Sequence, residues 1–109
     1  MATKLVLTLA LLSFAVSSAF AAQPAPLGCE GSLIEPTGNS SSITATLTLG
    51  SPPSINVGNA ALRTSPISNN KIQLKFGTKD FTGEYFHYTH ELFLIYKTGH
   101  LARLTCSPR

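Results

Sequence analysis

The sequence predicts an all-β protein, a small antiparallel barrel or sandwich of six to eight short strands that ends in a three-stranded meander. Three observations support this fold class. Short segments with strand periodicity recur between turns rich in Gly, Pro, Ser and Asn. No heptad, internal repeat or helical stretch of any length interrupts them. The last third of the chain concentrates aromatic and branched aliphatic residues, which suit the half-buried surface of a pleated sheet.

The N-terminus has the regions of a secretory signal peptide. Lys4 supplies the positive charge, and residues 5–16 form an apolar run that is too short to span a bilayer. Ala19-Phe20-Ala21 then provides the small residues that signal peptidase accepts. We therefore predict a signal peptide at 1–21, a flexible leader at 22–28 and a single domain at 29–109. A buried N-terminal helix is the alternative, but the apolar run has no polar face.

Cleavage would leave one small domain of about 88 residues with little net charge. Removing Lys4 lowers the net charge of the full chain, +3, by one unit, and the charged residues are scattered. This composition argues against a nucleic-acid partner, and no further apolar stretch is long enough to span a membrane. We expect an exported protein, either periplasmic or extracellular.

The two cysteines, Cys29 and Cys106, lie near opposite ends of the mature chain. In the oxidising compartment that export implies, an even pair in a small domain is most simply one disulfide. Closing so long a loop contributes about 4–5 kcal/mol to stability by the chain-entropy argument. Two free thiols are one alternative. A lipid anchor on Cys29 is another, because Leu27-Gly28-Cys29 looks like the end of a lipoprotein cleavage site, although Pro26 does not fit one.

The first half of the domain begins with residues 29–35, and residues 36–42 form a turn rich in Ser and Gly. Residues 43–49 then alternate strictly between apolar side chains and threonines, which predicts a strand with one solvated face. The next turn contains Pro52 and Pro53. They end the strand because proline lacks the amide proton that a strand interior must donate.

The middle of the chain has weaker patterns. Residues 54–57 are consistent with another short strand, whereas 58–70 show no clear period and leave a helical turn possible at 59–63. Residues 71–76 alternate again and predict a strand. Its expected buried side chains are Ile72, Leu74 and Phe76.

Three strands are predicted for the C-terminal meander, at residues 85–88, 92–96 and 101–106. Two-residue turns at Thr89-His90 and Thr98-Gly99 would join them, since glycine readily adopts the positive φ that a tight hairpin needs. All aromatic residues of the mature chain lie from residue 76 onward. We therefore expect thinner N-terminal strands to pack over a heavier C-terminal sheet.

These turns fix a register and divide the meander into two faces. The face expected to be core, and to direct the disulfide inward, carries Phe86, Phe93, Ile95, Ala102, Leu104 and Cys106. The opposite face would carry the candidate interface residues Tyr85, Leu92, Leu94, Tyr96, Leu101 and Arg103. So many large apolar groups are not expected to stay in water on a small monomer. A covering segment (the leader or residues 58–70), self-association and another protein partner all remain open explanations.

Two segments also carry a pattern, Cys29–Pro36 at the start and Gly83–Leu92 followed by Leu104-Thr105-Cys106 at the end. The pattern resembles that of small exported two-cysteine proteins of proteobacteria, which end with Gly-x-Ile-Asp-Arg-x-Thr-Gly-x-Leu and then Leu-x-Cys. Their Asp-Arg pair corresponds to Phe86-His87 here. The resemblance implies a compact antiparallel β fold with paired cysteines, and it implies no activity because that group has none assigned.

The candidate metal-binding residues are His87, His90 and Glu91, since two imidazoles and a carboxylate can hold a transition metal. Exposed histidines of a turn are the alternative interpretation. A glycosidase-like pair could be formed by Glu84 and Glu91, but no Gly-x-Ser-x-Gly elbow is present. We therefore expect an exported non-enzymatic β domain, without a cofactor, that acts as a binding or envelope-associated structural module. A metal-binding protein or small hydrolase that uses the three residues named first is the alternative.

Overall fold

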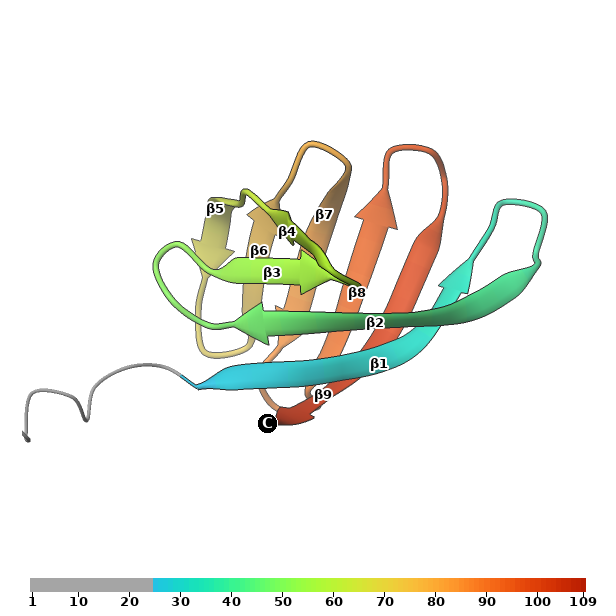
Figure 1. The fold of residues 1–109 in the computed structure, drawn as a ribbon. Coiled ribbons are helices and arrows are strands. Elements are labelled where there is room, and N and C mark those ends of the chain that lie inside the picture. Colours follow the sequence, from blue (N-terminus) through green and yellow to red (C-terminus); the bar gives the residue numbers. More distant parts are fainter. Residues whose placement is uncertain (1–24) are drawn as a thin grey trace, which may run out of the picture.

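The computed structural model describes residues 25–109, which form one antiparallel sheet of nine strands and contain no helix (Figure 1). The predicted signal peptide lies outside the described residues. No helix within the described range is long and apolar enough to cross a membrane. The strands are β1 (Pro26–Ile34), β2 (Ser40–Thr48), β3 (Ser54–Val57), β4 (Ala60–Leu62), β5 (Ser65–Asn69), β6 (Gln73–Gly77), β7 (Phe81–Phe86), β8 (Glu91–Tyr96) and β9 (Leu101–Pro108).

The sheet curls into a half-barrel because its two outermost strands are consecutive in the chain. The strand order is β4-β3-β2-β1-β9-β8-β7-β6-β5, and only Arg63 and Thr64 separate β4 from β5. The two edges of the sheet must therefore meet at this link. In Figure 1, β2 and β3 pass in front of β6, β7 and β8 at a steep angle, an orthogonal arrangement of the two halves. The hydroxyl of Thr64 donates a hydrogen bond to the carbonyl of Pro53, which ties the link to the β2–β3 loop.

The all-β antiparallel class is confirmed, although nine strands exceed the predicted six to eight. The additional strands come from residues 58–70, where a helical turn was possible. Gly58 adopts a φ of 60°, which lets the chain reverse so that Ala60 pairs with Val57. Pairing with neighbouring strands outweighs the weak local preference of this segment.

The core fills the concave side of the curled sheet. Its fully buried large side chains come from both halves of the chain and are Phe76, Phe81, Leu47, Ile55, Leu74, Leu92, Leu94 and Leu104. The predicted alternation in the strand at 43–49 is confirmed, since Ala45 and Leu47 are buried. The N-terminal strands therefore do pack over the aromatic-rich C-terminal sheet.

Ile72 is 61% exposed, so its predicted burial is wrong. The side-chain oxygen of Asn70 accepts hydrogen bonds from the backbone N–H groups of Ile72 and Gln73, each at 2.9 Å. This turn keeps Ile72 out of the sheet, and β6 begins one residue later. The other two predicted residues of that strand, Leu74 and Phe76, are buried.

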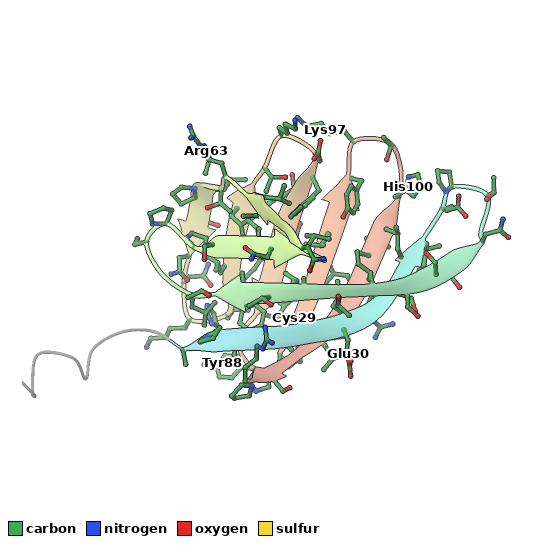
Figure 2. All side chains as sticks on the ribbon, viewed as in Figure 1. Cys29, Glu30, Arg63, Tyr88, Lys97 and His100 are labelled. Atoms are coloured by element: carbon green, nitrogen blue, oxygen red, sulfur yellow. A yellow bond between two sulfur atoms is a disulfide. The ribbon has the colours of Figure 1, made fainter. Side chains whose placement is uncertain are left out.

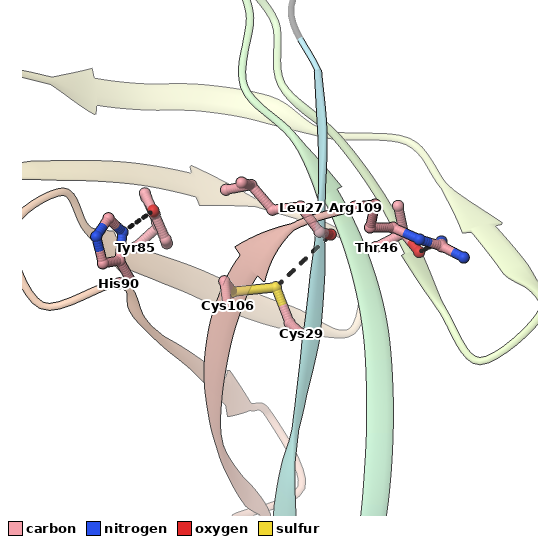
Figure 3. Close-up of a disulfide and its surroundings, with 7 residues drawn as sticks. All are labelled: Leu27, Cys29, Thr46, Tyr85, His90, Cys106 and Arg109. Carbon is pink, nitrogen blue, oxygen red and sulfur yellow. Dashed lines mark hydrogen bonds between the residues drawn. A yellow bond between two sulfur atoms is a disulfide. The ribbon is translucent and has the colours of Figure 1, made fainter.

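A disulfide joins Cys29 to Cys106, as the sequence predicts, across a sequence separation of 77 residues. The two residues face each other directly in the β1–β9 pairing, and their Cα atoms are 4.0 Å apart (Figure 3). The bond therefore covalently closes the junction between the first and last strands. The first strand starts earlier than expected, at Pro26, because Leu27 pairs with Leu47 and packs on the core.

The register between β8 and β9 differs by one residue from the predicted one. Leu92 faces Leu104 and Leu94 faces Ala102, so Phe93 does not face Leu104. The turn has three residues, 97–99, rather than two: the N–H of Tyr96 donates to the carbonyl of His100 at 3.0 Å. Gly99 takes a φ of 93° in this turn. The additional residue exchanges the faces of β8 relative to β9.

The turn between β7 and β8 is also longer than predicted. It contains four residues, 87–90, and the N–H of His90 donates to the carbonyl of Phe86 at 2.9 Å. His90 has a φ of 62° there. The β7–β8 register therefore differs by two residues from the predicted one. An even shift does not change the face of a side chain, so Phe86 and Phe93 still share one face. That face is the outer one, so the prediction that Phe86, Phe93 and Ile95 form the core is wrong, whereas Ala102, Leu104 and Cys106 are buried as predicted.

Candidate binding surface

The convex face of the sheet carries a run of large apolar side chains over β1, β7, β8 and β9. Leu101 lies between Ile95 and Ile34 in the cross-strand register, and the three are 37%, 45% and 37% exposed, respectively. Phe93, two residues before Ile95 on the same face, makes an edge-to-face contact with Phe86 at a centroid distance of 5.9 Å. We call these five residues, Ile34, Phe86, Phe93, Ile95 and Leu101, the outer apolar surface.

Two charged pairs lie beside the outer apolar surface. The guanidinium of Arg103 donates to the carboxylate of Glu91 at 3.0 and 3.3 Å. Glu84 accepts a hydrogen bond from Gln73 at 2.9 Å and lies 4.0 Å from the ammonium of Lys75. In the register, Phe93 faces Glu84 on one side and Arg103 on the other. Aromatic side chains and arginine are both enriched at protein-binding surfaces.

The six candidate interface residues do not form one surface. Tyr85, Leu92 and Leu94 are at most 2% exposed and belong to the core. Tyr96 is partly buried against Phe81, with a ring-centroid distance of 5.0 Å. Only Leu101 and Arg103 lie on the convex face: Leu101 is part of the outer apolar surface, and Arg103 lies beside it.

The side chains of β2 and β3 cover the face that was expected to need a partner. Leu47 and Ile55 belong to the same buried cluster as Leu92 and Leu94. Leu27, from the predicted leader, and Leu62, from residues 58–70, pack against this cluster and are themselves partly buried. The two segments proposed as covers therefore contribute partly buried side chains, whereas the fully buried side chains of this cover, Leu47 and Ile55, come from β2 and β3.

Sequence reasoning missed four residues of the outer apolar surface, namely Ile34, Phe86, Phe93 and Ile95. The missed signal is the segment Lys97-Thr98-Gly99. Three-residue hairpin loops commonly end in a glycine with positive φ, so the third residue of this segment fits the longer turn. Reading the turn that way would have placed Phe86, Phe93 and Ile95 outside and Leu92 and Leu94 inside.

Burial affects two tyrosines on the core side. Burial raises the pKa of Tyr85, whose hydroxyl lies 3.1 Å from Nδ1 of His90 (Figure 3). Burial and, to a lesser degree, the negative charge of Asp80 raise the pKa of Tyr96. Both effects favour the neutral phenol, as expected for side chains at the edge of a core.

The candidate metal ligands contact three different partners. Nε2 of His87 lies 3.3 Å from the side-chain oxygen of Asn69, His90 contacts Tyr85, and Glu91 pairs with Arg103. Between residues 25 and 109, no three His, Cys, Asp or Glu side chains gather closely enough to hold a metal ion. The structure therefore does not bring His87, His90 and Glu91 together as one site.

A depression of about 780 Å³ lies on β1, β2 and β9, and both cysteines of the disulfide are among its lining residues. Its floor includes Gly28, where a Cβ atom would lie 3.1 Å from Cγ of Arg109. The Arg109 guanidinium donates to the hydroxyl of Thr46 at 2.9 Å (Figure 3). The C-terminal arginine thus already lies across this depression.

The chain was compared with known proteins in three ways. No protein-family model matches it, and no curated protein or solved structure does either.

Proposed function

We propose that this protein is an exported, non-enzymatic β domain that acts as a binding module through its outer apolar surface. The observation that carries the proposal is the exposure of Ile95 and Leu101, 45% and 37%, side by side on neighbouring strands. The core is formed on the opposite, concave face, so core formation does not account for these side chains. Clustered exposed apolar groups beside polar residues are a feature of interaction sites.

Two features support export. The N-terminal sequence has the composition of a signal peptide, and the disulfide between Cys29 and Cys106 belongs to oxidising compartments. Periplasm and extracellular space both meet this requirement.

The partner that best fits the surface is a second copy of the chain. Glu84 and Arg103 lie on opposite sides of Phe93 in the register. A two-fold axis near Phe93 would place the arginine of one copy against the glutamate of the other, and the apolar side chains would meet at the centre. Such charge complementarity fixes the orientation of the two copies more than it adds affinity.

The test compares oligomeric state between two matched double variants of the mature chain, by light scattering after size-exclusion chromatography. Ile95→Asp with Leu101→Asp is expected to give a monomer, because four buried carboxylates at a two-fold interface would be desolvated without partners. Ile67→Asp with Ile72→Asp removes two isoleucines elsewhere on the molecule that are even more exposed, 57% and 61%. This control is expected to associate like the wild type.

Both variants should keep the circular dichroism spectrum of the wild type, since all four substituted side chains are exposed. Loss of association in the control as well would show that added charge alone prevents it, and would contradict a role for the outer apolar surface. For the alternative function, a metal-binding protein or small hydrolase, no contact of His87, His90 or Glu91 provides support.

A further inference from the structure

A cleft of about 610 Å³ lies at the corner where β4 passes into β5. Residues 61–63 and 65 line one side, and residues 77–79 line the other. The corner opens because β4 pairs with β3 while β5 pairs with β6, and only Arg63 and Thr64 connect the two strands. The cleft is thus a consequence of how the curled sheet ends, and its volume is within the range of small-molecule sites.

The lining of this corner cleft combines apolar groups with two cations. Ala61, Gly77 and the partly buried Leu62 supply the apolar part, Ser65 and Thr78 add hydroxyl groups, and Arg63 and Lys79 supply the positive charges. Both cationic heads lack an ion pair within residues 25–109, where the pairs that form are Lys75–Glu84 and Arg103–Glu91. Figure 2 shows the Arg63 side chain extending outward at the corner.

The β8–β9 turn, next to the cleft, contributes one further cation, Lys97. The N–H of Lys97 donates to the carbonyl of Asp80 at 3.0 Å, which holds the β8–β9 turn beside the β6–β7 turn. Figure 2 places Lys97 at the same end of the molecule as Arg63. Asp80 is the one carboxylate of this turn pair, and its charge acts on Tyr96. The charged residues of the cleft lining and these two turns are therefore three cations, Arg63, Lys79 and Lys97, and one anion, Asp80.

We propose that the corner cleft binds a free anionic amphiphile with a single alkyl chain, of which a fatty acid carboxylate is the simplest example. The alkyl chain would lie along Ala61 and Leu62, and the carboxylate would pair with Arg63 and Lys79. A neutral amphiphile would leave the two cations without a counter-charge, and a small anion would leave the apolar lining in water. This proposal goes beyond the protein–protein contact proposed above, which uses a different surface.

The experiment is a calorimetric titration of the mature protein with decanoate, kept below its micelle-forming concentration. We expect one bound decanoate per chain, at least tenfold weaker binding of decanol, and no measurable binding of acetate. The variant Arg63→Gln with Lys79→Gln should weaken decanoate binding by about tenfold, since two partly exposed ion pairs are lost.

A matched control removes the same two positive charges elsewhere. Lys71→Gln with Arg109→Gln changes residues outside the cleft lining, and its affinity for decanoate should stay within about twofold of the wild type. The dissociated variant Ile95→Asp with Leu101→Asp should also bind decanoate normally, which separates this proposal from the previous one. Circular dichroism checks that each variant is folded, and the two single variants each report a smaller loss.

Three results would overturn the proposal. The first is no heat of binding with decanoate, and the second is equal binding of decanol, which would show that the cations do not recognise the head group. The third is binding of phosphatidylglycerol vesicles without binding of decanoate. That result would assign the two cations of the cleft to a membrane surface rather than to a free ligand.

Discussion

Two glycines stand where the structure has no room for a side chain. A Cβ atom on Gly31 would lie 1.9 Å from the carbonyl oxygen of Arg103, because β1 and β9 approach closely there. On Gly83 it would lie 2.3 Å from the ring of Phe76, which covers this glycine in the β6–β7 pairing. Glycine within a strand often marks such a close approach of backbone or ring.

The clearer of the two for mutagenesis is Gly31. We expect Gly31→Ala to lower the free energy of unfolding by about 2–3 kcal/mol, since the backbone of β9 must move to admit the methyl group. Urea unfolding followed by circular dichroism measures this difference. Gly77→Ala is the control, because the nearest atom to its Cβ would be 3.8 Å away. Equal stability of Gly31→Ala and the wild type would contradict the close approach of the strands.

Tyr85 gives a pH dependence with a defined sign. Burial raises its pKa above the ordinary value of 10.0, so the folded state favours the protonated phenol more than the unfolded state does. Its contribution to stability is complete below pH 10 and is lost as pH rises through the folded-state pKa. Urea unfolding between pH 8 and pH 11 should therefore show a smaller loss of stability for Tyr85→Phe. An identical pH profile for both proteins would contradict this role.

At the scale of elements, turn length decides which side of the meander becomes core. Leu94 is fully buried and its neighbour Ile95 is 45% exposed. The three-residue turn at 97–99 places Leu94 opposite Ala102, on the concave face. A two-residue turn would have placed Ile95 there instead.

Adjacent substitutions test this register directly. Leu94→Ala should lower the free energy of unfolding by about 2–5 kcal/mol because it leaves a cavity in the core. Ile95→Ala should change it by less than about 1 kcal/mol, since the side chain is exposed. Urea unfolding of the two variants gives the comparison. The opposite order of the two effects would support the register expected from sequence.

The sequence was sufficient to predict the fold class, the disulfide and most strands, because strand periodicity is a local signal and two cysteines in an exported domain have one simple pairing. Leu47, Leu74 and Phe76 are buried as their alternation predicts. The sequence was not sufficient to predict the outer apolar surface. One additional residue in the turn before Leu101 decides which face of β8 points inward, and both faces of β8 are apolar. Hydrophobicity alone does not indicate whether Leu92 or Phe93 is buried. The corner cleft was also missed, since it depends on how the two edges of the curled sheet are joined at Arg63-Thr64.

For the whole molecule, two links hold the curl of the sheet. The disulfide joins β1 to β9 at the middle of the strand order, and Arg63-Thr64 joins the two edges. The N-terminal half of the sheet, β1 to β4, is therefore joined to the C-terminal half, β5 to β9, at the β1–β9 junction and at the β4–β5 link. This arrangement gives a small chain a core on one face and leaves apolar side chains of β8 and β9 exposed on the convex face.

Removing the disulfide should weaken this closure substantially. Cys29→Ala with Cys106→Ala should lower the free energy of unfolding by about 4–5 kcal/mol, because the unfolded chain gains the entropy of a long open loop. Urea unfolding of this variant and of the oxidised wild type measures the loss. A loss below about 1 kcal/mol would show that the β1–β9 hydrogen bonds suffice for closure.

The most direct test of the proposed function is sedimentation equilibrium of the mature, oxidised protein over a wide range of concentrations. The outer apolar surface predicts a reversible increase in mass from one chain to two, and no such increase for Ile95→Asp with Leu101→Asp. A wild-type protein that remains a single chain at every concentration would contradict self-association through this surface, and so would a double variant that dimerises as the wild type does.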